Sequence, residues 1–321
     1  MEKLTRMENL NAVADPLATV GEALRLGVVI CSVGRPDCVR ALIPSLAGQT
    51  RPADKVLFVV TCPEDLDFDP APMFPPATSV EVLIAPKGLP SQRNFGLDAL
   101  AGHVDTVVFF DDDFVPSRTA LAGIEAAFGQ MPDVSGLTGR VIADGINGAG
   151  FTMPEATAKV ADWDAAHAGP VVAPRVLGAD LVGLYGCNMA FRMSAVGDTR
   201  FDDSLPLYAW LEDIDFAARV PGRMVKTDAF SGVHCGVKFG RESAGRRLGY
   251  SQVVNPWYLW RKGSVPAALA AKLVFRNVAA NHAKSFFPEP WVDRLARASG
   301  NRLAVLEILK GSATPGRIIN L

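Results

Sequence analysis

The sequence lacks the long apolar segments that membrane-spanning and secreted proteins carry. Within its 321 residues, no apolar run approaches the roughly 20 residues that span a bilayer. The first residues, Met1 to Arg6, contain no apolar core of a secretory signal peptide. We therefore expect a cytoplasmic protein, and we leave open a peripheral contact with the inner face of the membrane.

Cysteine is scarce, and the two signs of charge are nearly balanced. The five cysteines are scattered without a C-x-x-C pair, which disfavours both a disulfide framework and a zinc site. The net charge of −2 argues against general binding to nucleic acid. With 49% hydrophobic residues, the chain has a globular composition and can build one large core or two fused ones.

Two common nucleotide-binding signatures are also missing. Neither G-x-G-x-x-G nor G-x-x-x-x-G-K-[ST] occurs, so the dinucleotide fingerprint and the phosphate-binding P-loop are both absent. If the chain binds a nucleotide, it must neutralise the phosphates in another way.

Apolar runs of strand length alternate with helical patterns in the first third of the chain. After Pro36, apolar residues recur at helical spacing, and Pro44 is expected to kink or shorten that helix. A second helix is predicted to carry residues 92–94 and to bury Leu97 and Leu100. The predicted strands are 27–32, 55–60, 80–84 and 107–110. Because continuous apolar strands are covered on both faces, this order predicts an α/β fold with a Rossmann-like, mostly parallel central sheet flanked by helices.

The remainder of the chain divides by composition. Residues 143–180 are rich in Gly, Ala and Pro and are predicted to form a long irregular excursion. The predicted domains are an N-terminal extension (1–26), a domain of two halves (27–115 and 116–234) and a helical C-terminal region (235–321). Within the last region, helices are predicted at 265–280 and 290–309.

Three consecutive carboxylates follow the strand Val107–Phe110. Asp111, Asp112 and Asp113 cannot be buried in a core at low cost unless they are paired, solvated or bound to a cation. Ligands of an open α/β sheet bind at the carboxyl ends of its strands. The triplet is therefore predicted to form the floor of a site, and its charge suggests a divalent metal.

The order of several motifs resembles a known enzyme family. The motifs are V-x-I-C-S-x-x-R-P, G-L-P-S-Q-R-N-x-G, F-F-D-D-D, G-C-N-M-A-F-R and L-E-D-I-D-F-x-x-R, followed by His234. Together they resemble glycosyltransferase family 2, whose members have the GT-A fold with a D-x-D motif, over residues 27–234. The resemblance implies inverting, metal-dependent transfer of a sugar from a nucleotide-diphosphate sugar to an acceptor hydroxyl, with Mn²⁺ or Mg²⁺ as the cofactor.

The resemblance also implies roles for single residues. Asp113 and His234 correspond to the metal ligands, and Asp213 corresponds to the general base that takes the acceptor proton. Asp111 corresponds to a residue near the ribose or the metal. Asp112 should point the other way, because side chains alternate along a strand, and it is expected to support the donor site. A lone histidine in a glycine-flanked loop is otherwise a hydrogen-bonded structural residue, and first-turn acids such as Asp213 are common in helices.

The remaining expected contacts concern donor and acceptor. Nucleotide-sugar binding is expected from Ser32, Arg35, Thr61, Arg93 and Asn94, and acceptor binding from Asn188 and Glu212. Thr61 stands where many family members have an acid that binds the base, so a UDP-sugar is expected only from family frequency. The acceptor is expected to be a glycan or lipid-linked glycan of polysaccharide or cell-envelope synthesis, and no nucleic acid partner is expected.

Three questions remain open. The chain could be a non-catalytic sugar-nucleotide-binding scaffold of a polysaccharide-assembly complex. Lys238, Arg241, Arg246 and Arg247 could form a lid over the diphosphate or a solvated loop. The aromatic and basic stretch 255–262 could meet a membrane or pack as a C-terminal cap.

Overall fold

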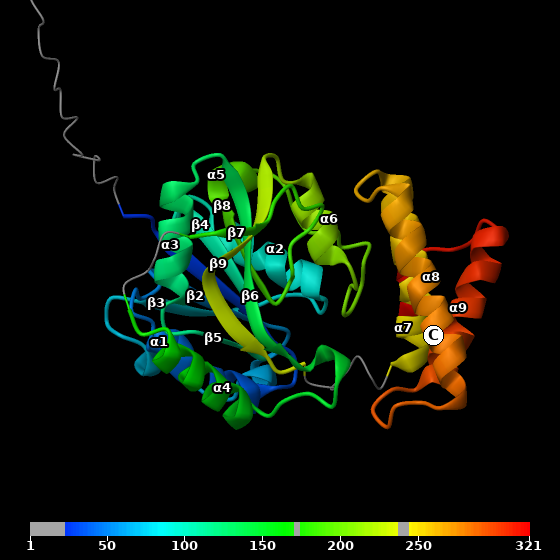
Figure 1. Ribbon diagram of the computed structural model, residues 1–321, viewed down its shortest axis with the longest axis horizontal. Helices are drawn as coiled ribbons and strands as arrows, with labels where there is room; N and C mark the ends of the chain where they lie inside the picture. Colours follow the sequence, from blue (N-terminus) through cyan, green and yellow to red (C-terminus); the bar gives the residue numbers. More distant parts are fainter. Residues whose placement is uncertain (1–22, 170–173, 237–243) are drawn as a thin grey trace, which may run out of the picture.

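Four parallel strands form the first half of the sheet in a computed structural model that describes residues 23–169, 174–236 and 244–321 (Figure 1). Their order across the sheet is β3 (Ser79–Ile84), β2 (Lys55–Val60), β1 (Leu26–Cys31) and β4 (Thr106–Asp111). Apart from one end residue each, β1, β2 and β4 are buried along their length, as their continuous apolar runs predict. β3 lies at the edge and is largely exposed.

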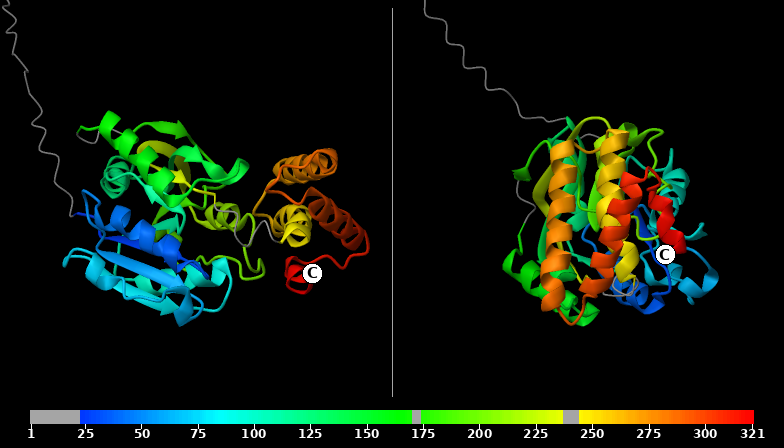
Figure 2. Two further views of the ribbon diagram at one scale, coloured as in Figure 1. Left: turned by 90° about the horizontal axis from the view of Figure 1, so that it is seen from below. Right: turned by 90° about the vertical axis from the view of Figure 1, so that its right-hand side faces the viewer.

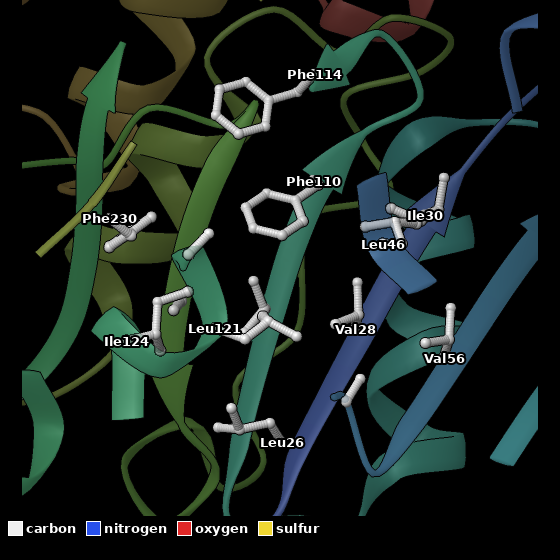
Figure 3. Packing of buried hydrophobic residues seen from close by; sticks show 14 of the residues in the cluster. Leu26, Val28, Ile30, Leu46, Val56, Phe110, Phe114, Leu121, Ile124 and Phe230 are labelled. Carbon is white, nitrogen blue, oxygen red and sulfur yellow. The ribbon is translucent and has the colours of Figure 1, made fainter. Parts of the chain in front are cut away.

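Helices cover both faces of this half. On one face, α1 (Pro36–Ala47) and α3 (Ala120–Gln130) pack against β1 and β4, as Figure 3 shows for Leu46 and Leu121 beside Val28 and Phe110. On the other face lie α2 (Leu89–Leu100), α5 (Met193–Val196) and α6 (Glu212–Arg219). Consecutive strand residues therefore bury opposite sides, and the predicted α/β class is confirmed. Pro44 lies within α1 and does not end it.

The second half of the sheet is mixed in direction. Its strands are β8 (Asn188–Arg192), β6 (Val134–Asp144), β9 (Arg223–His234), β5 (Phe114–Pro116) and β7 (Val176–Gly178). β8 pairs antiparallel with β4 and joins the two halves. β5 pairs antiparallel with the end of β9 and places Phe114 opposite His234. This pairing brings His234 beside the residue after the acidic triplet, although more than a hundred residues separate them.

The prediction of an irregular excursion over 143–180 was wrong for its central part. That segment contains α4 (Met153–Ala166), which begins with a capping box between Thr152 and Glu155 and buries only Ala156 and Val160. Because the helix packs through so few residues, its apolar periodicity is weak. Short 3-10 turns lie at η1 (Pro63–Asp65), η2 (Ala71–Met73) and η3 (Gly145–Asn147).

Three long helices follow the last strand. They are α7 (Gly245–Lys262), α8 (Ala267–Ala283) and α9 (Arg294–Leu309), with η4 (Lys284–Phe286) and η5 (Pro315–Asn320) after α8 and α9. They stand beside the sheet domain, with α7 nearest to it (Figure 2). α8 and α9 match the predicted helices, whereas α7 merges the predicted basic segment and the aromatic stretch into one helix that contains Pro256. The C-terminal cap packs through buried residues such as Leu259 in α7. No helix among these described segments is long and apolar enough to cross a bilayer.

Gly249 of α7 and Gly300 of α9 allow the two helices to cross closely. A Cβ atom at Gly249 would lie 2.1 Å from the carbonyl oxygen of Arg297. Gly249→Ala is therefore expected to lower the free energy of unfolding by about 1–3 kcal/mol, the usual cost of overpacking, in denaturant unfolding. Gly129→Ala is the matched control, because no atom lies within 4 Å of its Cβ position in α3. Equal effects of the two substitutions would contradict the close crossing.

Candidate functional site

Two carboxylates of the triplet and one histidine converge at the carboxyl end of β4. Ligand atoms of Asp111, Asp113 and His234 all lie within 4.8 Å of one another, and His234 Nε2 is 3.5 Å from Asp113 Oδ1. The backbone N–H of Cys235 donates to the carbonyl oxygen of Asp113 at 2.9 Å, which fixes the end of β9 against the triplet. Carboxylate oxygens suit Mg²⁺ and Mn²⁺, and imidazole also suits Mn²⁺, so this donor set fits a divalent cation.

His234 is held from its other ring nitrogen. Asp144 lies 2.9 Å from His234 Nδ1 and also accepts a hydrogen bond from the Tyr185 hydroxyl at 2.9 Å. Burial opposes a charge on the imidazole, but the bonds to Asp113 and Asp144 outweigh it and raise the pKa of His234 to about 10. A histidine ligand whose second nitrogen is bound to a carboxylate is a common metal-site arrangement. Neither Asp144 nor Tyr185 was predicted from the sequence.

Asp112 points away from this cluster, as strand alternation predicts. Its carboxylate accepts from Ser32 Oγ at 2.6 Å and pairs with Arg35 at 2.5 Å. Burial outweighs the Arg35 charge and raises the pKa of Asp112 to about 7. Ser32, Arg35 and Asp112 thus form one unit on the nucleotide side of the predicted site.

Arg93 links α2 to the acids around it. Its guanidinium pairs with Glu212 at 2.5 Å and with Asp111 at 3.1 Å, and it donates to the carbonyl oxygen of Gly186 at 3.0 Å. Burial raises the pKa of Glu212 to about 8 despite the Arg93 charge. Glu212 Oε2 is buried without a hydrogen-bond partner among the described residues, so this carboxylate retains an unused acceptor.

Asp213 lies in the first turn of α6, where the sequence predicted it. Its oxygens accept from the backbone N–H groups of Gly186 at 2.9 Å and Ile214 at 2.8 Å. The positive end of the helix dipole at this position favours the ionised form. Burial nevertheless raises the pKa of Asp213, with the Arg93 charge and these two bonds opposing it. A carboxylate with a raised pKa is a stronger base than an exposed aspartate.

Three adjoining cavities surround these residues. The first, of about 360 Å³, is lined by Ser32, Arg35, Gln92 and Asp112 from the sheet domain and by Arg247 of α7. The second, of about 520 Å³, is lined by Arg93, Asp111, Glu212, Asp213 and His234. The third, of about 600 Å³, lies between Asp144 and the C-terminal helices. The first two share Asp111, so the end of β4 joins both.

A strained loop separates the first two cavities. Leu207, Ala209 and Leu211 have φ values of 61°, 50° and 76°, in the left-handed region that non-glycine residues avoid. Each such residue costs about 1–3 kcal/mol, and strain of this kind gathers at functional sites. The loop leads directly into Glu212 and Asp213, so it sets the position of both carboxylates.

The fold has relatives among solved structures, although the sequence alone finds none. No protein-family model matches the chain, and no curated protein does. The mannosyltransferase PcManGT from Pyrobaculum calidifontis is similar with a TM-score of 0.52 and 15% identity, over 93% of this chain and 86% of that one. The fold is that of a glycosyltransferase.

A second similar protein is TarS of S. aureus. Its residues 1–349 align with a TM-score of 0.49 and 12% identity, over 90% of this chain and 92% of that one. In a longer TarS structure the chain spans 44% of the length, with a TM-score of 0.43 and 15% identity over 82% of this chain. Because both scores are below 0.5, the fold assignment rests on PcManGT.

Three predicted site residues contact protein groups in the structure. The side chain of Asn94 bonds both backbone polar groups of Phe201. Asn188 is fully buried in β8, where its side-chain oxygen accepts from the hydroxyl of Thr138. The hydroxyl of Thr61 donates to Asp65 at 2.6 Å. None of the three lines the cavities described above, so their positions suit support of the site more than contact with a ligand.

Asp65 organises the loops that follow β1 and β2. It is buried and accepts from the backbone N–H groups of Gly34 at 2.6 Å and Thr61 at 2.8 Å, besides the Thr61 hydroxyl. Asp65 therefore links the loop after β1 to the loop after β2. Of the predicted lid residues, Lys238 and Arg241 lie outside the described residues, while Arg246 and Arg247 belong to α7. Arg247 lines the first cavity, so one of the four predicted lid residues lies at the site.

Proposed function

We propose that the chain is an inverting, metal-dependent glycosyltransferase of family 2 that transfers a sugar, expected to be a hexose, from a nucleoside-diphosphate sugar to an acceptor hydroxyl. One observation carries the proposal: Asp111 and His234 of the acid–histidine cluster line the same cavity as Asp213. A site for the leaving diphosphate and a candidate base thus border one space large enough for a sugar. PcManGT, which has the same fold, is described in complex with GDP-Man and Mn²⁺, and this supports the donor class and the cation.

The donor is assigned to the first cavity and the junction at β4. Arg35 and Arg247 supply positive charge there, and the Ser32–Asp112 pair fixes the loop after β1. Asp111, Asp113 and His234 would hold Mn²⁺ or Mg²⁺, which as a Lewis acid stabilises the charge that develops on the leaving diphosphate. UDP-sugars are the first donors to test because of their frequency in the family, since the loop at Thr61 does not specify a base.

The acceptor is assigned to the second cavity. Asp213 takes the proton of the acceptor hydroxyl while the oxygen of that hydroxyl forms a bond to the anomeric carbon of the sugar. The bond from the anomeric carbon to the diphosphate oxygen breaks on the opposite face. The configuration at the anomeric carbon is thereby inverted and the proton resides on Asp213. The electron pair of the broken bond leaves with the nucleoside diphosphate. The unused Oε2 of Glu212 can accept a hydrogen bond from a sugar hydroxyl. The acceptor is proposed to be a glycan or lipid-linked glycan.

The test is release of nucleoside diphosphate from a panel of nucleotide sugars. We expect turnover with Mn²⁺ or Mg²⁺ for at least one donor, loss of turnover with EDTA, and recovery when the metal is added back. Calorimetric titration of the same donors separates binding from catalysis. Donor binding without transfer to any acceptor would instead favour the scaffold alternative, and neither binding nor turnover would refute the proposal.

Asp144 should affect metal binding through its contact with His234. Asp144→Ala removes the carboxylate at Nδ1 that orients the imidazole, so Mn²⁺ affinity is expected to fall by about 10–100-fold. Calorimetric titration with Mn²⁺ measures this directly. Tyr185→Phe is the matched comparison, because it removes a neutral hydroxyl that contacts Asp144 at 2.9 Å and His234 Nδ1 at 3.3 Å but leaves the carboxylate in place, so the affinity should fall less. An equal loss in both variants would contradict the specific role of the carboxylate.

A further inference from the structure

The C-terminal helices expose large apolar side chains that the proposed reaction does not use. We refer to five of them as the outer apolar residues: Phe275, Phe286, Phe287, Leu295 and Leu309. Their exposed fractions run from 68% to 88%, and no other large hydrophobic side chain in the described part of the chain exceeds 57%. Groups of large exposed apolar side chains often mark a surface that binds a partner.

The outer apolar residues occupy the two helices farthest from the sheet. Phe275 lies on α8, Phe286 and Phe287 follow at its end, and Leu295 and Leu309 lie on α9. Figures 1 and 2 place α8 and α9 side by side at the end of the molecule. The opposite faces of these helices form their own core with α7 through residues such as Tyr250, Val254 and Ala304. The exposed side chains are therefore not needed to hold the bundle together.

Charge is unevenly distributed between the two parts of the chain. Residues 244–321 contain twelve Lys or Arg and three Asp or Glu, a net charge of +9 in a chain whose total is −2. Lys272 on α8, Arg302 on α9 and Lys310 directly after α9 are exposed among the outer apolar residues. Within the described ranges, none of these three side chains forms an ion pair. The surface thus combines free cations with phenylalanine and leucine.

We propose that this outer surface of α8 and α9 binds the face of a bilayer that contains anionic lipids. Phenylalanine and leucine would enter the boundary between headgroups and acyl chains, while the lysine and arginine side chains contact lipid phosphates. Basic amphipathic helices of this composition lie in the membrane interface and do not span the bilayer.

Charge complementarity favours a bilayer over a second copy of this chain. A dimer formed through α8 and α9 would juxtapose two copies of the segment 267–310, whose net charge is +4, and like charges across an interface are unfavourable. An anionic bilayer supplies both an apolar interior for the phenylalanines and negative charge for Lys272 and Arg302.

The inner side of α8 connects this surface to the third cavity. Asn277 and Ala280 line that cavity, which borders Asp144 and Tyr185 of the site. If the proposed function holds, docking through α8 would bring the acceptor side close to the bilayer and suit an acceptor anchored there. Bilayer binding itself does not depend on the reaction, so it can be tested separately.

The experiment is co-sedimentation of the full chain with vesicles, without donor or acceptor. We expect binding to vesicles of equal parts phosphatidylcholine and phosphatidylglycerol, weak binding to phosphatidylcholine alone, and release as salt is raised. The charge-reversed variant Lys272→Glu with Arg302→Glu should bind at least about tenfold more weakly, because each basic residue near the surface contributes about fivefold. Phe286→Ala with Phe287→Ala should also weaken binding by about tenfold or more.

Matched variants keep the test specific. Lys159→Glu reverses an exposed charge on α4, and Ile84→Ala removes an exposed apolar side chain from β3. Both should bind vesicles as the unaltered chain does. The unfolding midpoints of the C-terminal variants should be unchanged, because all four altered side chains are exposed.

Three outcomes would overturn the proposal. They are no binding to anionic vesicles, equal weakening by the control variants, and a concentration-dependent dimer in light scattering that the Phe286/Phe287 variant abolishes without vesicle binding. Each leaves nucleoside-diphosphate release untouched, so failure here is distinguishable from failure of the proposed function.

Discussion

Replacing Asp213 by Asn is expected to reduce kcat by about 10²–10⁴-fold while the affinity for the donor stays within a few-fold. A positioned general base contributes a factor of this size, and an amide cannot take the acceptor proton. Asparagine can keep the hydrogen bond from the Gly186 N–H through its side-chain oxygen and loses only the bond from the N–H of Ile214, the next residue in the same helix. The local structure should therefore survive, and single-turnover kinetics with calorimetric donor binding will separate the two effects.

The pH profile gives this prediction a second readout. Because burial raises the pKa of Asp213, activity should be lost on acidification at a higher pH than an exposed aspartate would require. Asp203→Asn is the matched control, since Asp203 is exposed and lines none of the cavities. Turnover that Asp213→Asn leaves unchanged, or that Asp203→Asn lowers equally, would show that another group takes the proton.

The parallel half of the fold was predictable because the sequence of each strand shows whether both of its faces are buried. Val28 and Val29 face opposite helices, and both are apolar, so a run of this kind can only be covered on both sides. The acidic triplet is similarly local, because Asp111 and Asp113 share one side of the chain and Asp112 faces Ser32. These features follow from the spacing of neighbouring residues alone.

The completed site depends on pairings that the sequence does not encode locally. His234 reaches Asp113 only because β5 pairs with the end of β9, and Asp144 reaches His234 because β6 runs beside it. Non-local strand pairing is not specified by apolar alternation, so Asp144 carried no visible signal. The family resemblance supplied His234, but it supplied no partner for its second nitrogen.

Two helices, α4 and α7, were not predicted individually. α4 buries only Ala156 and Val160, and its useful signal was the Thr152–Glu155 capping box, which the Gly- and Ala-rich context obscured. α7 buries most of its residues, but it contains Pro256, which lacks the N–H of a helical hydrogen bond. Packing of α7 against α9 stabilises the helix despite the missing N–H, and tertiary contacts of this kind override local preference.

Replacing Arg93 by Met is expected to lower the free energy of unfolding by about 3–5 kcal/mol, the cost of breaking a buried ion pair by removing one partner. Arg93 is nearly inaccessible and neutralises Glu212, which is equally buried. Chemical denaturation will measure the loss. Arg175→Met is the matched control: its pair with Asp228 has a similar distance, 2.7 Å, but Arg175 is mostly exposed, so the loss should be at most about 1 kcal/mol.

The origin of the Arg93 effect can be separated from simple loss of packing. Without the guanidinium, the pKa of Glu212 should rise further above its already raised value of about 8. A carboxyl with a raised folded pKa keeps its full stability below the unfolded pKa of 4.5 and loses it as the pH rises. The losses in the two chains diverge only above the lower folded pKa, so the deficit of Arg93→Met should grow as the pH rises above about 8. Adding Glu212→Gln should remove this growth, because an amide does not titrate. A deficit that neither grows above about pH 8 nor changes with Glu212→Gln would mean that Arg93 stabilises the fold through its contacts with Gly186 and the rings of Phe109 and Phe201, not through charge.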